Sequence, residues 1–353
     1  MIRAAIVGAT GYTGREVHYW LSRHPSVELV SLMGSGPESV RKMVEENPDL
    51  DASLCEPFSL DTLAARKPDV VFLATPPEVS LQMAPGLLQL GHVVIDLSAA
   101  FRLRRPEQYE RWYGFQHSAP KLLEQAVYGL PEVHGERIRD AQLIANPGCY
   151  PTSLLLALLP FVRQGLIDPS CPIICDSKSG LTGAGKNPEY VFAEINENCQ
   201  AYKVGSHRHT PELLQELGTG DDVTVAFTPH LVPVNRGILS TIYLRTREQM
   251  GRDELVDLLR AAYRDRRFVR VYNNGRLPQM KQVVGSNFCD IGCVAYEGTR
   301  MVTLVSTIDN LVKGAAGQAV QNMNLRFGLN EALGLIPDSR LQAPGSRLHG
   351  IAD

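Results

Sequence analysis

The first 150 residues alternate between short apolar runs and longer stretches with apolar residues at helical spacing. The apolar runs have the length of buried strands, and the stretches between them predict helices. We expect strands at 4–7, 27–33, 70–74, 93–97 and 142–145, and helices at 15–23, 80–90 and 106–113. This alternation predicts an α/β unit with a doubly wound parallel sheet of the Rossmann type.

After residue 149 the pattern changes. The apolar runs become longer and fewer helical stretches separate them, which favours a mixed or antiparallel sheet with strands at 172–176, 223–229, 239–245 and 301–308. A last helix at 312–327 is long enough to return to the first unit, and the tail after Ile336 is irregular. We therefore predict a first domain of residues 1–148, completed by residues 311–353, and a second α/β domain of residues 149–310.

Composition and charge narrow the functional classes. The chain has 353 residues, 44% hydrophobic and 21% charged, which suits a globular protein of two domains. A net charge of −3 without a basic block argues against a nucleic-acid partner. The plainest apolar run, 154–162, is too short to cross a bilayer, and the first strand begins too early to leave room for a signal peptide. The odd count of seven cysteines fits a reducing compartment, so we expect a cytoplasmic protein without a membrane partner.

A glycine-rich turn follows the first expected strand and reads Gly8-Ala9-Thr10-Gly11-Tyr12-Thr13-Gly14. Glycines at this place allow a tight turn, a close approach of the backbone to a pyrophosphate, and close packing of helix on strand. The spacing by itself is weak, and a glycine-rich turn without a ligand is the alternative. Its position after the first strand favours a dinucleotide site.

The end of the second strand indicates which dinucleotide binds. An NAD site usually has a carboxylate there for the ribose 2′-hydroxyl, but Met33 is followed by Gly34-Ser35-Gly36. Ser35, Arg41 and Lys42 can instead meet a 2′-phosphate, so we predict NADP(H) rather than NAD(H). Taken alone, each of Arg41 and Lys42 is better explained as a solvated helix charge.

Cys149 lies between an expected strand end and the apolar run 153–162. Pro147 and Gly148 favour a tight turn, and Pro151 suits a first helical turn. Cys149 is therefore expected at a helix N-terminus, where the helix dipole and free N–H groups lower a thiol pKa. This predicts a nucleophilic cysteine, with a buried structural thiol as the alternative.

Two histidines, His207 and His209, would share one face of an extended segment with Arg208 opposite. Thr210 suits an N-cap and Pro211 the first helical position, so His209 is expected beside a helix N-terminus, where the dipole favours a neutral imidazole. We predict His209 as the acid–base partner of Cys149, with His207 nearer the substrate. A structural or exposed histidine is the alternative for either.

Two further motifs have the residue types of ligand sites. The segment 176–187 nearly matches a phosphate-binding P-loop, but Asn187 replaces its Ser or Thr, so a loop lining the substrate pocket or a plain turn is expected. The cysteine pairs Cys171/Cys175 and Cys289/Cys293 have a spacing that a strand would place too far apart for one metal ion. We predict no metal.

Four segments together, 146–152, 206–212, 285–292 and 308–319, resemble the N-acetyl-gamma-glutamyl-phosphate reductases of arginine biosynthesis over nearly the whole chain. The resemblance implies a fold like that of glyceraldehyde-3-phosphate and aspartate-semialdehyde dehydrogenases, and NADPH-dependent reduction of an N-acetylglutamyl acyl phosphate to the semialdehyde through a cysteine thioester. A similar branch that reduces a carrier-linked aminoadipyl phosphate is the alternative enzyme. A dinucleotide sensor with Cys149 as a redox switch is the non-enzymatic alternative.

The resemblance also implies the site residues. The catalytic set is Cys149, His209 and His207, and the substrate-binding set is Ser98, Arg102, Asn146 and Arg236. The cofactor-binding set is Gly8, Thr10, Gly11, Tyr12, Thr13, Gly14, Ser35, Thr75, Pro76, Ser179, Gly180, Gly183 and Asn310. Many family members have a Ser-Arg pair where this chain has Gly34-Ser35-Gly36-Pro37. A small-molecule acyl phosphate is the expected partner, and a homo-oligomer, dimer or tetramer, is the expected assembly.

Overall fold

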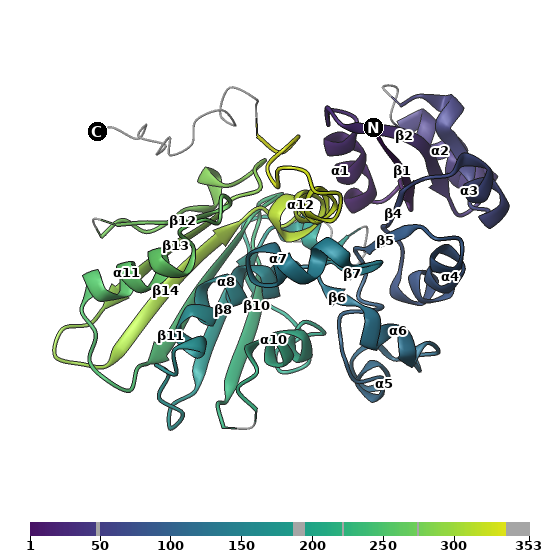
Figure 1. Ribbon diagram of the computed structural model, residues 1–353. Helices are drawn as coiled ribbons and strands as arrows, with labels where there is room; N and C mark the ends of the chain where they lie inside the picture. Colours follow the sequence, from purple (N-terminus) through teal and green to yellow (C-terminus); the bar gives the residue numbers. More distant parts are fainter. Residues whose placement is uncertain (47–49, 186–194, 221, 274, 337–353) are drawn as a thin grey trace.

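The computed structural model describes residues 1–46, 50–185, 195–220, 222–273 and 275–336. Within these residues the strands form two seven-stranded sheets that follow one another in the sequence (Figure 1). No helix in this described part is both long and apolar enough to cross a membrane.

The first sheet is parallel throughout, with the strand order β3-β2-β1-β4-β5-β7-β6. Its strands are β1 Ile2–Val7, β2 Val27–Gly34, β3 Cys55–Pro57, β4 Val70–Leu73, β5 Val93–Asp96, β6 Val127–Tyr128 and β7 Leu143–Ala145. The helices between them are α1 Tyr12–Leu21, α2 Pro37–Glu46, α3 Leu60–Arg66, α4 Pro77–Gln89, α5 Glu107–Tyr113, α6 Pro120–Gln125 and α7 Pro131–Asp140. The predicted doubly wound parallel sheet is confirmed.

The strand order reverses between β1 and β4, so the loops that follow these two strands border one crevice. Open parallel sheets bind ligands at such a switch point.

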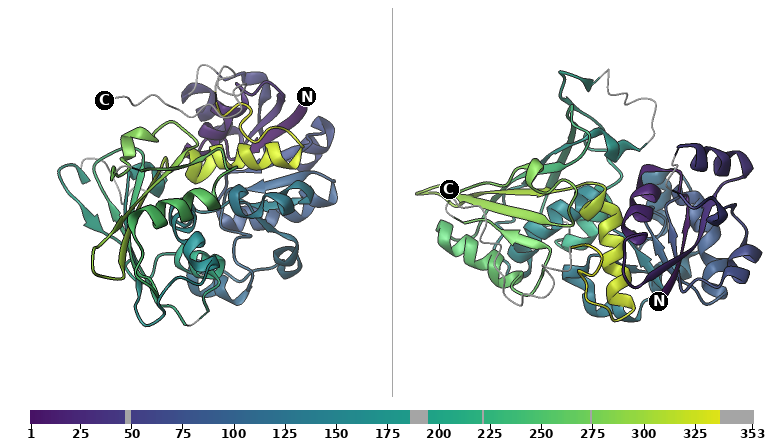
Figure 2. Two further views of the ribbon diagram at one scale, coloured as in Figure 1. Left: turned by 60° about the vertical axis from the view of Figure 1, so that its left-hand side comes forward. Right: turned by 90° about the horizontal axis from the view of Figure 1, so that it is seen from above.

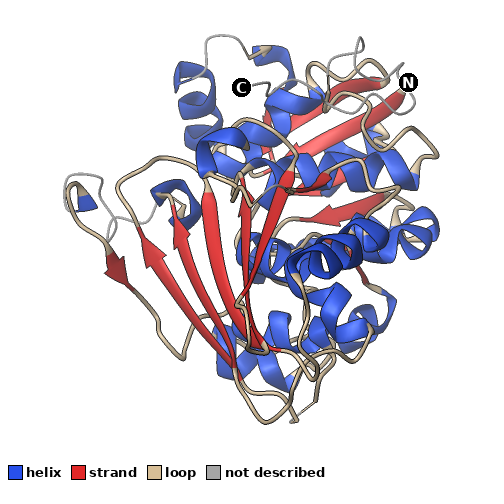
Figure 3. Cartoon of the chain, turned by 90° about the vertical axis from the view of Figure 1, so that its left-hand side faces the viewer, coloured by secondary structure: helices blue, strands red, loops and turns tan. Residues whose placement is uncertain are grey.

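The second sheet is mixed, as predicted, in the order β12-β13-β14-β11-β8-β10-β9. Its strands are β8 Ile173–Ser179, β9 Gln200–Ala201, β10 Val225–Leu231, β11 Ile238–Arg245, β12 Val269–Val271, β13 Cys289–Ala295 and β14 Met301–Ile308, and the longer ones run side by side (Figure 3). The apolar pattern missed β13 because this strand buries Asp290, whose charge is met by Arg270 at 2.5 and 2.8 Å.

Helix α8, Cys149–Arg163, packs against β11 and β14 of this sheet and is buried from Tyr150 to Phe161. A helix that is apolar on nearly all sides belongs in a core, so the position of its first residue is fixed by packing along the rest of its length. Helices α10, Thr210–Leu217, and α11, Arg252–Ala262, contact α8.

The chain returns to the first sheet through α12, Gly317–Arg326, which lies between the two sheets (Figure 2). The predicted helix 312–327 differs at its start, where residues 312–316 form a π-helical turn. Gly314 there donates to the Asp309 carbonyl oxygen, and a Cβ on Gly314 would lie 2.6 Å from the Cβ of Cys149. Lys313 is fully buried beside Glu132 of α7, with Nζ 2.6 Å from Oε1.

Candidate active site

Cys149 is the first residue of α8, as predicted from the turn before it. Gly148 is the N-cap in an extended conformation, and the N–H groups of Cys149 and Tyr150 in the first helical turn face the thiol. The thiol is therefore beside a set of backbone donors at the positive end of a long buried helix.

The expected lowering of the Cys149 pKa is wrong for the protein without ligands. Burial raises the pKa of this thiol to about 11. Arg102 and the N–H groups of Tyr150 and Cys149 act in the predicted direction, but burial outweighs them. Cys149 is only partly covered by protein, so water on its exposed side moderates the effect of burial. The resting group is a thiol, and its proton must leave when it attacks.

The two histidines come from a tight turn and not from the extended segment that we expected. His209 is the N-cap of α10 with φ −83° and ψ −9°, and the helix starts at Thr210, one residue earlier than predicted. The rings still meet, with centroids 4.8 Å apart, because the His209 N–H donates to Nδ1 of His207 at 3.1 Å. Both side chains are buried.

His209 lies directly against the residue before the cysteine. A Cβ on Gly148 would be 2.5 Å from Nε2 of His209, so only glycine leaves room for the ring. The pKa of His209 is well below its usual value, first because of burial and then because of His207, Arg102 and Arg208. The predicted neutral imidazole agrees with this direction, but burial, and not the helix dipole, is its main cause.

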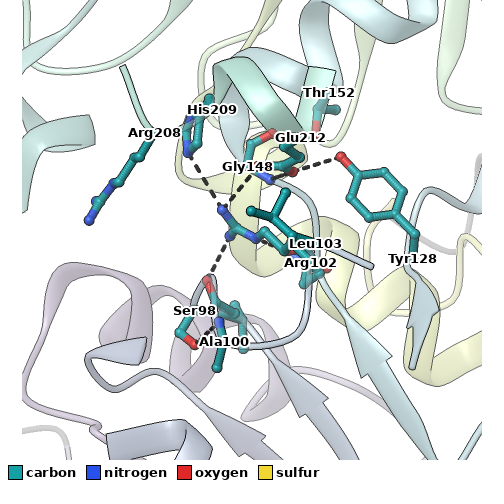
Figure 4. A network of polar contacts seen from close by, with 12 residues as sticks. Ser98, Ala100, Arg102, Leu103, Tyr128, Gly148, Thr152, Arg208, His209 and Glu212 are labelled. Atoms are coloured by element: carbon teal, nitrogen blue, oxygen red, sulfur yellow. Dashed lines mark hydrogen bonds and ion pairs between the residues drawn. The ribbon is translucent and has the colours of Figure 1, made fainter. Parts of the chain in front are cut away.

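Arg102 joins the histidine to a buried carboxylate (Figure 4). Its Nη1 is 3.5 Å from both His209 Nε2 and Glu212 Oε2. Its Nε donates to the Asn146 carbonyl oxygen at 2.8 Å, and Nη2 donates to the Leu97 carbonyl oxygen at 3.0 Å. The guanidinium is thus fixed at the centre of the site.

Glu212 is a site residue that sequence reasoning missed. Its Oε1 accepts the Gly148 N–H and the Tyr128 hydroxyl, both at 2.7 Å, and the side chain is fully buried. The available signal was its position three residues after His209 in the same motif, which puts both on the first turn of α10. No sequence motif pointed to Tyr128, because this residue belongs to β6 and is far from α10 in the sequence.

Ser98 and Asn146 have their side chains in contact with protein groups. The Ser98 hydroxyl donates to Asp96 at 2.8 Å and accepts the Ala100 N–H at 3.0 Å. Asn146 is fully buried, where its amide donates to the Ala315 carbonyl oxygen and accepts from Asn322 of α12. Asn146 therefore ties the strand end before Cys149 to the returning helix.

Arg236 pairs with two carboxylates and bridges the two halves of the molecule. It donates to Glu16 of α1 at 3.1 and 2.5 Å, and its Nη1 is 3.7 Å from Asp309. Glu16 also accepts from the indole N–H of Trp20 at 3.2 Å. The side-chain partners of Arg236 are therefore these two carboxylates, and they differ from the partners of Arg102, Ser98 and Asn146.

The glycine-rich loop after β8 packs beside Arg236. A Cβ on Gly180 would be 2.7 Å from the Asn235 carbonyl oxygen, and one on Gly183 would be 3.1 Å from the Ser179 hydroxyl. Asn310 accepts the Gly237 N–H and donates to Thr182, so it fastens this loop to the end of β14. Asn187, which breaks the P-loop pattern, lies outside the described residues.

The turn after β1 has the form that a dinucleotide site needs. Gly8 has φ +87°, and a Cβ there would lie 2.4 Å from the Ala74 carbonyl oxygen, while a Cβ on Gly14 would lie 2.2 Å from the Gly8 carbonyl oxygen. Gly11 is the N-cap of α1 and has open space, with only the Gly8 carbonyl oxygen within 4 Å of a Cβ. Two glycines make the turn and its packing, and the third leaves a cradle for a phosphate.

Other expected cofactor residues lie in this turn, after β2 or after β4. Thr10, Tyr12 and Thr13 belong to the turn and the start of α1, and Pro76 is the N-cap of α4, next to Thr75 at the switch point. Ser35 is exposed after β2. Arg41 and Lys42 are exposed on α2, where they pair with glutamates of their own helix.

The two cysteine pairs considered for a metal lie apart in structure. Cys171 precedes β8, while Cys175, Cys289 and Cys293 are buried strand residues. Within the described ranges, no group of three or more His, Cys, Asp or Glu side chains gathers as a metal site would require.

Comparisons with known proteins match this architecture. Residues 3–141 match the semialdehyde dehydrogenase NAD binding domain, and residues 149–310 match the semialdehyde dehydrogenase dimerisation domain. Among solved structures, aspartate semialdehyde dehydrogenase II of Vibrio cholerae, complexed with ASA, has a TM-score of 0.65 at 20% identity and covers 93% of this chain and 98% of its own. The enzyme of Candida albicans, determined with NADP, has a TM-score of 0.64 at 17% identity, with coverage of 93% and 100%. These two share the fold.

Sequence relatives are much more similar. N-acetyl-gamma-glutamyl-phosphate reductase of Desulforudis audaxviator is 50% identical over 345 residues, which is 95% of this chain and 98% of the relative. The protein of that name from Symbiobacterium thermophilum is 48% identical over 345 residues, with coverage of 95% and 97%. The chain belongs to the N-acetyl-gamma-glutamyl-phosphate reductase family.

Proposed function

We propose that this protein reduces N-acetyl-L-glutamyl 5-phosphate to N-acetyl-L-glutamate 5-semialdehyde and phosphate, with NADPH as the reductant. The observation that carries the proposal is the placement of a cysteine at the start of α8 with His209 against its N-cap residue, in a chain about half identical to reductases of this name. A thiol, a neutral imidazole and free backbone donors are what acyl transfer from a phosphate requires.

The turn after β1 suits the cofactor, because Gly11 leaves open space at the N-terminus of α1. We propose that the cofactor-binding residues named from the sequence hold it, with Gly8–Gly14 at the pyrophosphate and Ser35 near the 2′-phosphate. When bound, NADPH supplies a hydride to the carbonyl carbon of the substrate. The chain reads Gly34-Ser35-Gly36 at the end of β2, without a carboxylate, which supports NADP(H) over NAD(H).

Cys149 acts as the nucleophile in this proposal. Its sulfur attacks the acyl carbonyl carbon, the bond from that carbon to the phosphate oxygen breaks, and phosphate leaves with the electron pair and takes up a proton from solvent. The thiol proton passes to His209, whose low pKa keeps the imidazole unprotonated before the attack. The product of this step is a thioester on Cys149, and the N–H groups at the start of α8 stabilise the negative oxygen formed on the way.

His209 returns the proton after reduction. The thiohemiacetal oxygen receives the proton from the imidazolium, and the same imidazole then removes it as the carbon–sulfur bond breaks. The aldehyde leaves, and Cys149 regains a proton. Arg102 beside His209 disfavours the imidazolium, because two cations at 3.5 Å repel in a buried site, and this repulsion favours the return of the proton.

We also propose how the work is divided between the two domains. Residues 1–148 with 311–353 would bind the cofactor, and residues 149–310 would carry the catalytic groups and form the oligomer. Ile174 and Tyr243 are directly paired neighbours on β8 and β11 and both are exposed, which supports a subunit contact on this sheet face. A cytoplasmic location remains a prediction. Ser98, Asn146 and Arg236 remain predicted substrate contacts.

The test is turnover by the purified protein. NADPH oxidation with the acetylglutamyl phosphate, and slower or absent oxidation with a carrier-linked aminoadipyl phosphate, would support the proposal. Cys149→Ser should bind NADPH normally and lose essentially all turnover, because a serine hydroxyl is a far weaker nucleophile. Appreciable activity in this variant would exclude the thioester, and NADPH binding without any turnover in the wild-type protein would favour the sensor.

A further inference from the structure

Two arginines border the cysteine–histidine site, and they differ in how their charge is met. Arg102 is 8% exposed and faces the fully buried carboxylate of Glu212. Arg208 is exposed and lies in the chain between the two buried imidazoles. The proposed substrate is anionic at its phosphoryl group and at its α-carboxylate, so the protein needs cationic donors that are free to bind it.

Arg102 has few N–H donors left to bind an anion of the substrate. Its Nε and Nη2 donate to the carbonyl oxygens of Asn146 and Leu97, and Nη1 faces Glu212 and His209. The adjoining carboxylate also balances the charge of the guanidinium. A ligand anion that approached Arg102 would have to compete with groups already in place.

Arg208 has the opposite character. Its backbone is held in place, because the Tyr113 hydroxyl donates to its carbonyl oxygen at 3.0 Å and the His209 N–H donates to His207. Its guanidinium forms no ion pair with a carboxylate in the described part of the chain, and the side chain extends away from the Arg102–Glu212 network (Figure 4). The charge is close enough to help lower the pKa of both His207 and His209.

We propose that Arg208 binds an anionic group of the substrate, either the α-carboxylate or the phosphoryl group, and so determines specificity for the acidic substrate. This proposal rests on the proposed function. A guanidinium binds either group through paired N–H donors. Because the backbone of Arg208 is already held in place and its guanidinium is exposed, binding would require little rearrangement of the protein. The same contact would place the reacting carbonyl beside the two histidines that flank Arg208.

The reverse reaction distinguishes the two anions, because phosphate and the semialdehyde are then separate substrates. With NADP+ saturating, Arg208→Gln should raise the KM for one of them by about tenfold to a hundredfold, the scale of a lost charge-assisted hydrogen bond. The KM for NADP+ should not change. Arg139→Gln, which alters an exposed arginine of α7, is the matched control and should behave as wild type.

A higher KM for phosphate identifies the phosphoryl group. A higher KM for the semialdehyde, with no change for an analogue that lacks the α-carboxylate, identifies the carboxylate. Arg208→Lys should recover part of the affinity, which a merely structural role would not predict. Unchanged KM values for both anions would overturn the proposal. Absence of turnover in the wild-type protein would instead overturn the proposed function, and with it this inference.

Discussion

The Glu212 carboxylate accepts the backbone N–H of Gly148 at 2.7 Å, and this bond links the first turn of α10 to the residue that caps the cysteine helix. The same carboxylate faces Arg102 at 3.5 Å. The two charges act on the Cys149 thiol in opposite directions, because Arg102 lowers its pKa and Glu212 raises it. Glu212 is thus a positioning residue whose charge also limits thiolate formation.

Glu212→Gln should lower the pKa of the Cys149 thiol, since the amide oxygen can still accept the Gly148 N–H while the negative charge is gone. We expect alkylation of Cys149 at pH 8 to become about threefold faster or more, the effect of one unit charge at short range in protein. Stability should fall by about 3 kcal/mol, because Arg102 is left buried without its partner. The pH profile of iodoacetamide labelling, with unfolding by urea, measures both.

Arg102→Met should shift the same labelling profile to higher pH, and Glu136→Gln, at an exposed glutamate of α7, should leave it unchanged. Equal profiles for wild type and Glu212→Gln would show that the two charges do not control the thiol.

In the wild-type protein without ligands, labelling of Cys149 should rise steadily with pH and show no plateau near neutrality. A thiol pKa of about 11 leaves only a small thiolate fraction at pH 7. The rate should therefore increase roughly tenfold per pH unit between pH 6.5 and 9. Mass spectrometry of the Cys149 peptide separates it from the more exposed Cys199. A plateau with a midpoint below pH 7 would restore the low pKa expected from the helix N-terminus alone.

That difference shows what the sequence can and cannot predict. Pro147, Gly148 and Pro151 are local signals, so the turn and the helix start at Cys149 follow from them. The burial that raises the thiol pKa comes from packing by distant segments, such as Gly314 against the Cys149 Cβ, and no local pattern reports it. The α/β class and the mixed second sheet were likewise predictable from apolar runs, whereas β13 was hidden by its buried Asp290.

At the histidine turn, the helix start was predictable from the sequence, but the conformation of the residues before it was not. The helix signals at Thr210 and Pro211 were correct to within one residue. The extended conformation was wrong, because the His209 N–H turns back to His207 and brings the rings together by a different route. Glu16 and Arg236 lie 220 positions apart, and their pairing follows only from how the two sheets pack across α12.

His209→Asn should reduce kcat and kcat/KM together by roughly a hundredfold or more, the scale for loss of a positioned proton-transfer group, without changing NADPH affinity. His207→Asn should mainly raise KM. The physical reason is that His209 Nε2 lies against Gly148, whereas the ring of His207 lies against Tyr150 and His209. Steady-state kinetics of both variants, with NADPH binding as the folding control, provides the measurement. The reverse pattern would assign the proton transfer to His207.

The protein should favour NADPH over NADH by about tenfold or more in kcat/KM, because β2 ends without a carboxylate and Ser35 is exposed there. Ser35→Asp should weaken NADPH selectively, since a carboxylate repels the 2′-phosphate and accepts from the 2′-hydroxyl of NADH. Initial rates with each cofactor measure the change. Equal kcat/KM values for the two cofactors in the wild type would contradict the prediction.

The stability of the protein should depend on pH through His207. Burial lowers the pKa of His207 to about 3, with smaller contributions from Arg208 and Lys203, against 6.5 for the free side chain. The unfolded chain therefore takes up a proton below pH 6.5 that the folded protein excludes. The free energy of unfolding is therefore unaffected by His207 above pH 6.5. As the pH falls from 6.5 toward 3, it decreases by roughly 1.4 kcal/mol per pH unit. The measurement is the free energy of unfolding in urea at pH 7.5 and at pH 5. Between these values the wild type should lose about 2 kcal/mol more than His207→Gln, because glutamine does not titrate. If both proteins show the same dependence on pH, His207 is hydrated or paired in solution and the burial that keeps this imidazole neutral is absent.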